Sequence, residues 1–248
     1  MNPVYNKILS ARNQGKKQYA VLLDPDKLTK KSLEVIISTA KDFPVDYFFV
    51  GGSLLMNNNL SYVINTLKQH LPQPVVLFPG SNLQIDAQAD AILFLSLISG
   101  RNADALIGQH VVAAPLLKKL KIEVISTGYM LIDCGKPTTV SYISNTTPIP
   151  YDKPSIAACT AMAGEMLGMK LIYADGGSGA SKPISEEIIQ AIRSAVDIPI
   201  VAGGGIRSAR QAELLLKAGA DIIVTGNGVE DDISLLKEIY QCVLELNS

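Results

Sequence analysis

Three glycine-rich stretches in the last third of the chain carry residues that could bind an anion. They read YADGGSG at 173–179, AGGGIRS at 202–208 and TGNG at 225–228, and each begins at the end of an apolar run. Glycines at such places let backbone N–H groups approach a phosphate closely, and a helix that starts behind them adds a partial positive charge. A single loop of this kind is explained equally well by a tight turn. Three in succession favour a phosphate-binding cradle over turns alone.

Asp175 lies where the first of these stretches leaves its apolar run. A carboxylate beside a phosphate cradle could accept a hydrogen bond from a ligand hydroxyl or remove the proton of that hydroxyl, whereas the simpler interpretation is a helix-capping acid. On the rim of a site it is expected to contribute little to stability. Tyr173 precedes it by two positions and therefore shares its face of a strand. Tyr129 ends another apolar run and fits a packed core ring as well as a ligand contact.

A second anion-handling site is predicted nearer the N-terminus. LLDPDKL places Asp24 and Asp26 after an apolar run, and Lys27 follows them. Mg²⁺ prefers one or two carboxylates together with phosphate oxygens and water, and a lysine could touch the same phosphates. A plain turn explains DPD equally well. VGGS ends the next apolar run, which puts the Ser53 hydroxyl within reach of the same ion, so the two sites together indicate two phosphorylated ligands or one long one.

Eight apolar runs provide the elements that must position these residues. They begin near residues 19, 47, 74, 91, 122, 171, 198 and 221, and most are followed by a helical pattern. Continuous runs of this kind are typical of parallel strands buried on both faces. We therefore predict an α/β fold, a (β/α)8 barrel that forms one domain over residues 1–248, rather than a doubly wound sheet, for which eight strands would be many. In such barrels the loops after the strands form the active-site face.

Two segments between the strands depart from a regular barrel. NLQIDAQ, after the third apolar run, is short for a barrel helix, and residues 134–154 predict a long loop rich in Thr, Ser and Pro. Long loops usually serve as lids or binding surfaces, so this one is expected to be functional. Elsewhere the helix boundaries are clear, with Ser185 and Ser208 as predicted N-caps and Gly219 as a predicted C-cap.

The composition favours a globular enzyme. Apolar residues make up 48% of the chain and charged residues 18%. The net charge of −1 argues against nucleic acid as a partner. Cys134, Cys159 and Cys242 are too widely spaced to predict a disulfide framework or a zinc site. The sequence shows neither a secretion signal nor an apolar stretch near the ~20 residues that span a bilayer, so a cytoplasmic location is expected.

The motifs occur in an order that resembles a known family. LLDPDK, VGGS, YADGGSGASKP, AGGGIRS and VTGNGVE together are similar to the geranylgeranylglyceryl phosphate synthases, and LIDCGKPTTVSYISNTTPIP resembles their group II branch. The resemblance covers essentially the whole chain. It implies a modified TIM barrel whose third helix is replaced by a looser segment. It also implies a prenyltransferase that moves a geranylgeranyl group from geranylgeranyl diphosphate to the C3 hydroxyl of sn-glycerol 1-phosphate, with Mg²⁺ as cofactor, to form the first ether bond of archaeal-type lipids.

The resemblance further implies a role for each matching residue. Asp24 and Ser53 match the metal positions, and Lys27 is expected to contact the diphosphate. The positions that match glycerol-phosphate contacts are Tyr173, Ala174, Asp175, Gly176, Gly177, Ser178, Gly179, Gly204, Gly205, Gly226 and Asn227. Many family members have Glu in place of Asp175, so the carboxylate of this chain is one methylene shorter. Cys134 stands where Gly is expected.

In this interpretation Mg²⁺ and Lys27 neutralise the departing diphosphate, the glycerol hydroxyl attacks the allylic carbon, and Asp175 accepts or orients the hydroxyl proton. Three alternatives stay open: a prenyl donor of another chain length, a sugar-phosphate isomerase or aldolase on the same barrel, and a non-catalytic barrel that binds a phosphorylated ligand. Assembly into a homo-oligomer and contact with a membrane surface are further expectations. The sequence does not fix the residues that line a prenyl groove.

Overall fold

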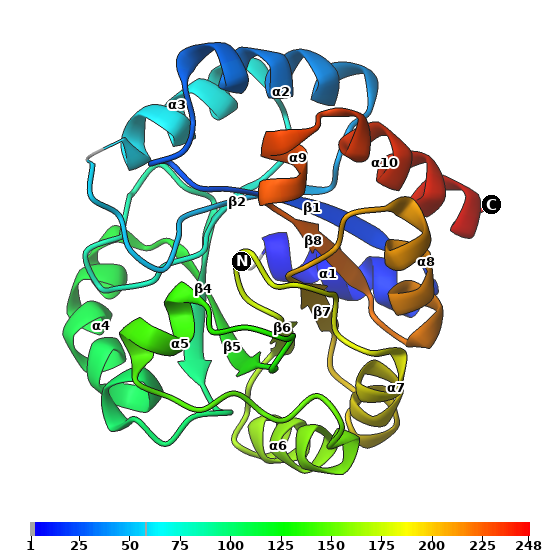
Figure 1. Ribbon diagram of the computed structural model, residues 1–248. Helices are drawn as coiled ribbons and strands as arrows, with labels where there is room; N and C mark the ends of the chain where they lie inside the picture. The colour runs from blue at the N-terminus through cyan, green and yellow to red at the C-terminus, as the bar shows by residue number, and fades with distance from the viewer. Residues whose placement is uncertain (1–2, 58) are drawn as a thin grey trace.

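Eight parallel strands form a closed barrel at the centre of the protein. The computed structural model describes residues 3–57 and 59–248. The strands are β1 (Gln18–Leu23), β2 (Tyr47–Val50), β3 (Val75–Leu77), β4 (Ala91–Leu97), β5 (Glu123–Leu131), β6 (Leu171–Asp175), β7 (Ile200–Gly203) and β8 (Ile222–Thr225). They pair in chain order, and β8 pairs with β1 to close the barrel (Figure 1). Each predicted apolar run forms one strand, which confirms the (β/α)8 prediction.

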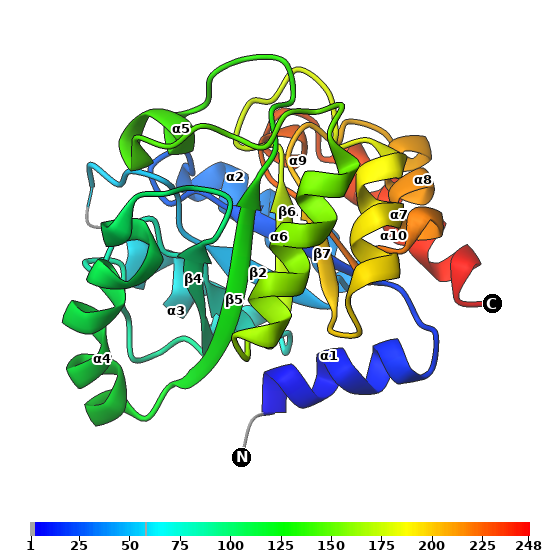
Figure 2. The ribbon, with the colours of Figure 1, turned by 90° about the horizontal axis from the view of Figure 1, so that it is seen from below.

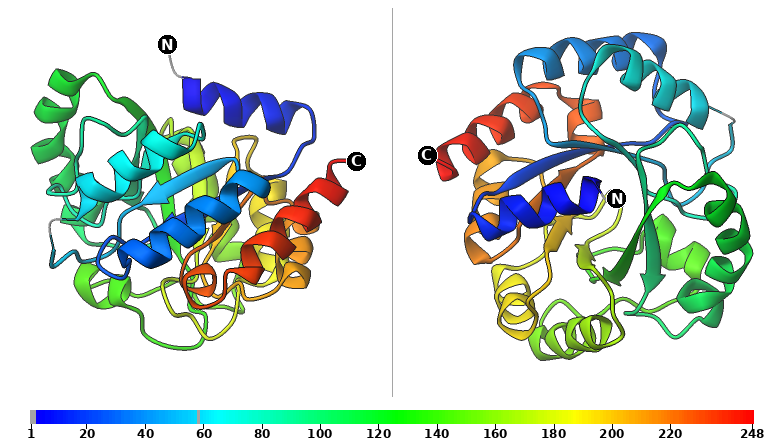
Figure 3. Two further views of the ribbon diagram at one scale, coloured as in Figure 1. Left: turned by 90° about the horizontal axis from the view of Figure 1, so that it is seen from above. Right: turned by 180° about the vertical axis from the view of Figure 1, so that it is seen from behind.

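Helices surround this barrel. They are α1 (Pro3–Asn13), α2 (Lys30–Asp42), α3 (Leu60–His70), α4 (Gln109–Leu120), α5 (Thr139–Ser144), α6 (Pro154–Met166), α7 (Glu186–Ala195), α8 (Ala209–Ala218), α9 (Asn227–Asp231) and α10 (Ser234–Leu246). A π-helical turn, Asp104–Gly108, leads into α4. α1 lies across the end of the barrel at which the strands begin (Figures 2 and 3). There Glu123 accepts hydrogen bonds from the backbone N–H groups of Val4 and Tyr5, both at 2.9 Å, so α1 closes this end.

The connection between β3 and β4 contains no helix. Residues 78–90, every one of which the structure describes, form only turns and irregular segments. The ring of helices is therefore open between α3 and α4 (Figure 1), and the predicted looser segment is confirmed. Gln84 holds the segment in place, because its Nε2 donates a hydrogen bond to the carbonyl of Gly52 at 2.9 Å.

The long loop predicted over residues 134–154 has more structure than expected. The short helix α5 lies within it, and Pro154 is already the first residue of α6. A parallel bridge between Ile132 and Ile149 ties the start of the segment to its end. A helix of six residues spans fewer than two turns, so it leaves too little apolar periodicity in the sequence to be recognised.

The predicted helix caps are present. Ser185 Oγ accepts a hydrogen bond from the backbone N–H of Ile188, and Ser208 Oγ accepts one from Gln211, both at 3.3 Å. Gly219 ends α8 with φ of +125°, a conformation that favours glycine. These local signals set where the helices begin and end, so they also set which loop residues remain at the barrel rim.

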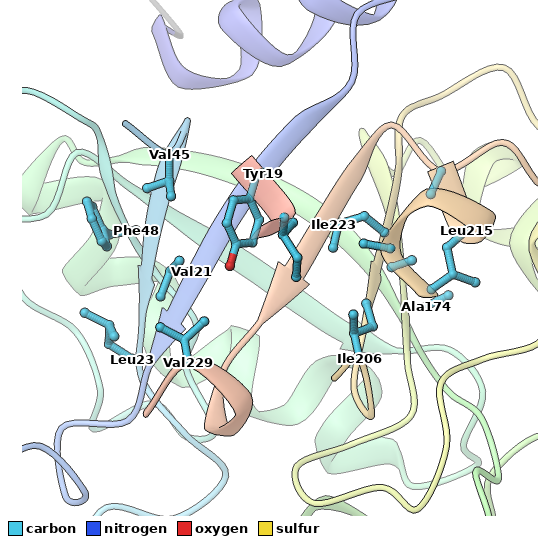
Figure 4. Close-up of a cluster of buried hydrophobic side chains, with 14 of the residues drawn as sticks. Tyr19, Val21, Leu23, Val45, Phe48, Ala174, Ile206, Leu215, Ile223 and Val229 are labelled. Atoms are coloured by element: carbon cyan, nitrogen blue, oxygen red, sulfur yellow. The ribbon is translucent and has the colours of Figure 1, made fainter. Parts of the chain in front are cut away.

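Apolar side chains fill two layers because successive residues of a strand point to opposite faces. One layer lies inside the barrel, where Tyr47, Phe49 and Tyr173 are at most 1% exposed. The other lies between the strands and the helices, and Figure 4 shows part of it around Val21 and Ile223. Together the layers make the barrel a rigid support for the loops at the ends of its strands.

Candidate active site

A cavity of about 780 Å³ opens at the end of the barrel where the strands terminate. The loops after β1, β2, β6, β7 and β8 line it, as expected for the active-site face. Of the predicted site residues, the structure brings together Asp24, Lys27, Ser53, Tyr173, Asp175, Gly177, Ser178, Gly179, Gly204, Gly205, Gly226 and Asn227. Ala174 and Gly176 lie outside this lining: Ala174 belongs to the layer beneath the helices, and Gly176 packs against Cys134.

Close approach between neighbouring loops requires the glycines of the cradle. Gly204 has φ of +80°, and a Cβ atom there would lie 2.6 Å from Asp175 Oδ1 and 2.7 Å from the backbone nitrogen of Gly177. A Cβ atom on Gly205 would lie 2.3 Å from the carbonyl oxygen of Lys182. The loops therefore need glycine for the turns themselves, and the same bare backbone forms the cavity wall where an anion would approach.

Asp175 is buried, with 7% of its surface exposed. Its Oδ2 accepts a hydrogen bond from the Tyr129 hydroxyl at 2.6 Å, and its Oδ1 accepts one from the backbone N–H of Gly177 at 2.8 Å. Burial raises the pKa of this carboxyl group above its ordinary value, and the two hydrogen bonds oppose the rise. The Asp175 side chain ties β5 to the loop after β6, so we now expect a larger contribution to stability than a rim position predicts.

Three aromatic rings form one wall of the cavity. Phe78, Tyr129 and Tyr173 pack with centroid separations of 5.2 to 6.0 Å. Burial and the neighbouring Asp175 carboxylate raise the pKa of Tyr129 well above its ordinary value, so its hydroxyl keeps its proton and donates it in the hydrogen bond to Asp175. Tyr129 is thus both a packed core ring and a polar contact of the site.

A chain of polar contacts crosses the cavity from β1 to β6. Lys27 Nζ lies 3.4 Å from Asp24 Oδ2 and donates a hydrogen bond to Asn227 Oδ1 at 3.0 Å. The side-chain nitrogen of Asn227 in turn donates to Ser178 Oγ at 3.2 Å. Lys27 is therefore placed between the predicted metal position and the predicted phosphate cradle, within reach of phosphates on either side.

The two acids of the DPD motif have different surroundings. The carboxylate of Asp26 accepts hydrogen bonds from the backbone N–H groups of Met56 and Asn57, so it orders the loop after β2. Asp24 faces the cavity, and its own backbone N–H donates to Glu230 at 3.2 Å. Burial raises the pKa of the Glu230 carboxyl group. The sequence interpretation missed Glu230, although its position at the end of VTGNGVE was a usable signal.

The charge balance of the cavity favours a bound cation. Seven carboxylate side chains line it, against two cationic ones, Lys27 and Arg207. Two phosphorylated ligands would bring further negative charge. Within residues 3–57 and 59–248 no three His, Cys, Asp or Glu side chains are grouped so that they could hold a metal alone. Asp24 and Ser53 instead fit Mg²⁺, which takes few protein ligands and completes its shell with phosphate oxygens and water.

An apolar groove of about 330 Å³ adjoins the cavity. Ser53, Phe78, Tyr129 and Val140 line both spaces. The groove runs along β4 beneath α4, where the looser β3–β4 segment takes the place of a helix. Its apolar lining includes Ile85, Ile92, Phe94, Leu95, Leu97, Ala105, Ala113 and Ile143. The sequence could not distinguish these groove residues from core residues, because both are apolar. The predicted loss of the third helix was the sequence feature that indicated where the groove lies.

The fold and the site define a class of protein, a (β/α)8 barrel in which a glycine-walled cavity of the phosphate-binding kind meets an apolar groove. Residues 12–245 match the PcrB family. The chain is 56% identical to the geranylgeranylglyceryl phosphate synthase of Spirosoma linguale over 94% of each chain. It is 39% identical to that of Pyrococcus horikoshii over 92% of this chain and 90% of the other. The chain therefore belongs to the PcrB family of geranylgeranylglyceryl phosphate synthases, as its motifs indicated.

A solved structure agrees with this assignment. The crystal structure of (S)-3-O-geranylgeranylglyceryl phosphate synthase from Thermoplasma acidophilum, in complex with its substrate sn-glycerol-1-phosphate, superposes on this protein with a TM-score of 0.90. The two sequences are 32% identical, and the match covers 98% of each chain. The barrel with its looser third connection is thus similar to that of a relative over nearly the whole length.

Proposed function

We propose that this protein transfers a geranylgeranyl group from geranylgeranyl diphosphate to the C3 hydroxyl of sn-glycerol 1-phosphate, which forms the first ether bond of an archaeal-type lipid. The observation that carries the proposal is the direct junction of a polar, glycine-walled cavity with an apolar groove, at which Phe78 and Tyr129 line both spaces. A phosphorylated alcohol and a prenyl diphosphate are ligands suited to such a pair. The T. acidophilum relative was crystallised with sn-glycerol-1-phosphate.

sn-Glycerol 1-phosphate fits the half of the cavity formed by the loops after β6, β7 and β8. The glycines at 177, 179, 204, 205 and 226 would present backbone to the phosphate, and Ser178 and Asn227 would add polar side chains. Asp175 lies at the start of this half, at the end of β6. The glycerol hydroxyls would then extend from the cradle toward its carboxylate.

The diphosphate of the prenyl donor fits the opposite side, at the ends of β1 and β2. Asp24 and Ser53 would hold Mg²⁺, which when bound supplies Lewis-acid neutralisation of the leaving diphosphate. Lys27, 3.4 Å from Asp24 Oδ2, would contact the same phosphates. The prenyl chain would pass Phe78 and Tyr129 and lie in the groove along β4.

Asp175 would accept or orient the proton of the attacking hydroxyl. Tyr129 and Gly177 use two of the roughly four lone-pair sites of its carboxylate and leave the others for a substrate. The raised pKa makes it a stronger base than a solvated aspartate. The faces of the three aromatic rings favour a neighbouring positive charge, which the allylic carbon acquires as the diphosphate departs.

The isomerase or aldolase alternative has less support. None of the eight strands, all of which the structure describes, carries a lysine that could form a Schiff base. Nor would a sugar phosphate use an apolar groove beside the phosphate cavity.

In residues 3–57 and 59–248, no helix has the length and apolar character that crossing a bilayer requires. Homo-oligomer formation stays a prediction.

Turnover with a series of donors tests the proposed function. Purified protein is incubated with sn-glycerol 1-phosphate and geranyl, farnesyl or geranylgeranyl diphosphate, with Mg²⁺ or with EDTA. We expect an ether product with the geranylgeranyl donor as the preferred substrate, and its loss in EDTA. Absence of ether product from every donor would contradict the proposal, and full activity in EDTA would remove the metal from it.

A further inference from the structure

We infer that the outer face of α4 is a docking surface for a bilayer that contains anionic lipids. The inference rests on the proposed function, because it concerns how a prenyl donor would reach the groove. Its starting point is a group of exposed apolar side chains, the α4 stripe, made of Ile107 from the π-helical turn that leads into α4 and of Val111, Val112 and Leu116 from α4 itself. They are 60%, 65%, 65% and 44% exposed. Apolar residues scattered singly over a surface need no explanation, but several gathered on one helix indicate an interaction site.

The α4 stripe and the groove occupy opposite faces of one helix. The buried residues of α4 are His110, Ala113 and Leu117, and helical geometry places them away from Val111 and Val112. His110 and Ala113 line the groove. Figures 1 and 2 show α4 at the outer edge of the molecule, with no other helix outside it. The thickness of one helix, α4, therefore separates the stripe on the surface from the groove beneath it.

The positive charge of α4 favours a membrane surface with anionic lipids as the partner that covers the α4 stripe. Residues 105–121 include Lys118, Lys119 and Lys121, all exposed, and no Asp or Glu. An apolar face accompanied by lysines is typical of helices that lie in the headgroup region of a membrane, where each lysine is attracted to anionic lipids.

Docking through α4 would also place the open side of the groove toward the lipid. The β3–β4 segment, which replaces a helix beside α4, carries Leu83, which is 89% exposed. Its neighbours Asn82 and Ile85 line the groove. A prenyl donor held in the bilayer would then enter the groove from the side, without exposing its chain to water, and the lipid product would leave by the same route.

Vesicle sedimentation of the full-length protein tests this inference. The probes are vesicles of phosphatidylcholine alone and of phosphatidylcholine with phosphatidylglycerol. We expect binding to the second kind, weakened by salt, and a loss of about tenfold in the partition coefficient for the double variant Val111→Gln, Val112→Gln, because its apolar contact with the interface is removed. Lys118→Gln with Lys119→Gln should abolish the preference for anionic vesicles.

A matched control is available on α6. Met166 and Leu167 are 78% and 77% exposed, so Met166→Gln with Leu167→Gln removes a similar amount of exposed apolar surface elsewhere. Unchanged vesicle binding by this control supports the inference. Equal losses from the α4 and α6 pairs, or no binding by the wild type, would overturn it. Dissociation of an oligomer by the α4 pair, measured by light scattering, would also overturn it, because the stripe would then belong to a contact between copies.

A vesicle-free assay keeps this test separate from that of the proposed function. Geranyl diphosphate is short and water-soluble, so the wild type and the α4 pair should turn it over equally in solution. Turnover without vesicle binding would overturn the docking surface alone. Vesicle binding without turnover of any prenyl diphosphate would overturn the proposed function alone.

Discussion

Replacing Asp175 by asparagine separates the chemical role of this residue from its structural one. The substitution preserves the shape of the side chain and removes its charge. The amide oxygen can still accept the backbone N–H of Gly177, but the amide nitrogen then faces the Tyr129 hydroxyl, which must turn its own proton away. The short, charge-assisted bond from Tyr129 is thereby replaced by a weaker one.

Stability and rate should respond by different amounts. Hydrogen bonds to charged groups contribute about 1.5–3 kcal/mol and neutral ones about 0.5–1.5 kcal/mol, so two weakened bonds predict a loss of about 1–3 kcal/mol in the free energy of unfolding. The lower cost of burying a neutral amide reduces this loss. Removal of a general base costs about 10²–10⁴-fold in rate, or roughly 3–5 kcal/mol of barrier. The variant should therefore stay folded while turnover collapses.

Single-turnover rates at saturating substrates, measured beside thermal unfolding, test this separation. Tyr129→Phe is the matched control, because it removes the same hydrogen bond and leaves the carboxylate. It should lose stability to a similar degree but less than about tenfold in rate. A near wild-type rate for Asp175→Asn would refute the reasoning, since the proton would then leave through water or the diphosphate.

The pH dependence follows from the raised pKa of Asp175. A base acts only when deprotonated, so the acidic limb of the turnover profile should lie above about 4, the ordinary value for aspartate, and should vanish in Asp175→Asn. A pKa that is higher in the folded than in the unfolded chain favours the protonated folded state. The contribution of Asp175 to stability is therefore largest below its unfolded pKa and declines as pH rises through its folded pKa.

Three further substitutions probe the division of the cavity. Asp24→Asn is expected to lower turnover by about 10²-fold or more while affinity for sn-glycerol 1-phosphate is kept, because Asp24 lies on the diphosphate side; an equal loss of that affinity in calorimetry would contradict the division. Gly204→Val should lower the unfolding temperature as well as phosphate affinity, since a Cβ there meets Asp175, and an unchanged unfolding temperature would argue against this geometry. Ser178→Ala should raise KM for glycerol phosphate about tenfold with little effect on stability, whereas a change confined to KM of the prenyl donor would place the phosphate elsewhere.

The barrel could be predicted from the sequence because its strands have a simple signature. Residues such as Phe48 and Val76 belong to continuous apolar runs, which parallel strands require when both their faces are covered. The caps Ser185 and Ser208 act within one turn of their own helices, so they too are visible locally. α5 was not predicted, because its six residues are too few to show the apolar periodicity of a helix.

The gathering of the candidate site residues in one cavity could also be predicted, because the carboxyl ends of parallel strands meet at one end of a barrel. Its details depend on contacts between residues far apart in the chain. Asp175 is buried and accepts a hydrogen bond from Tyr129, which lies on another strand, so its pKa and its structural role were not predictable from its neighbours in sequence. Likewise, Asp24 and Asp26 both line the cavity, and the hydrogen bonds that Asp26 accepts from the loop around Met56 distinguish it from Asp24.

The central claim is that the ether bond forms at C3 of sn-glycerol 1-phosphate. It is tested most directly by analysing, by mass spectrometry and NMR, what the purified protein makes from geranylgeranyl diphosphate and each enantiomer of glycerol phosphate. We expect equal amounts of diphosphate and of geranylgeranylglyceryl phosphate from the sn-1 enantiomer, with the ether at C3, and little product from the other. Release of diphosphate without an ether product, or equal use of the two enantiomers, would contradict the account.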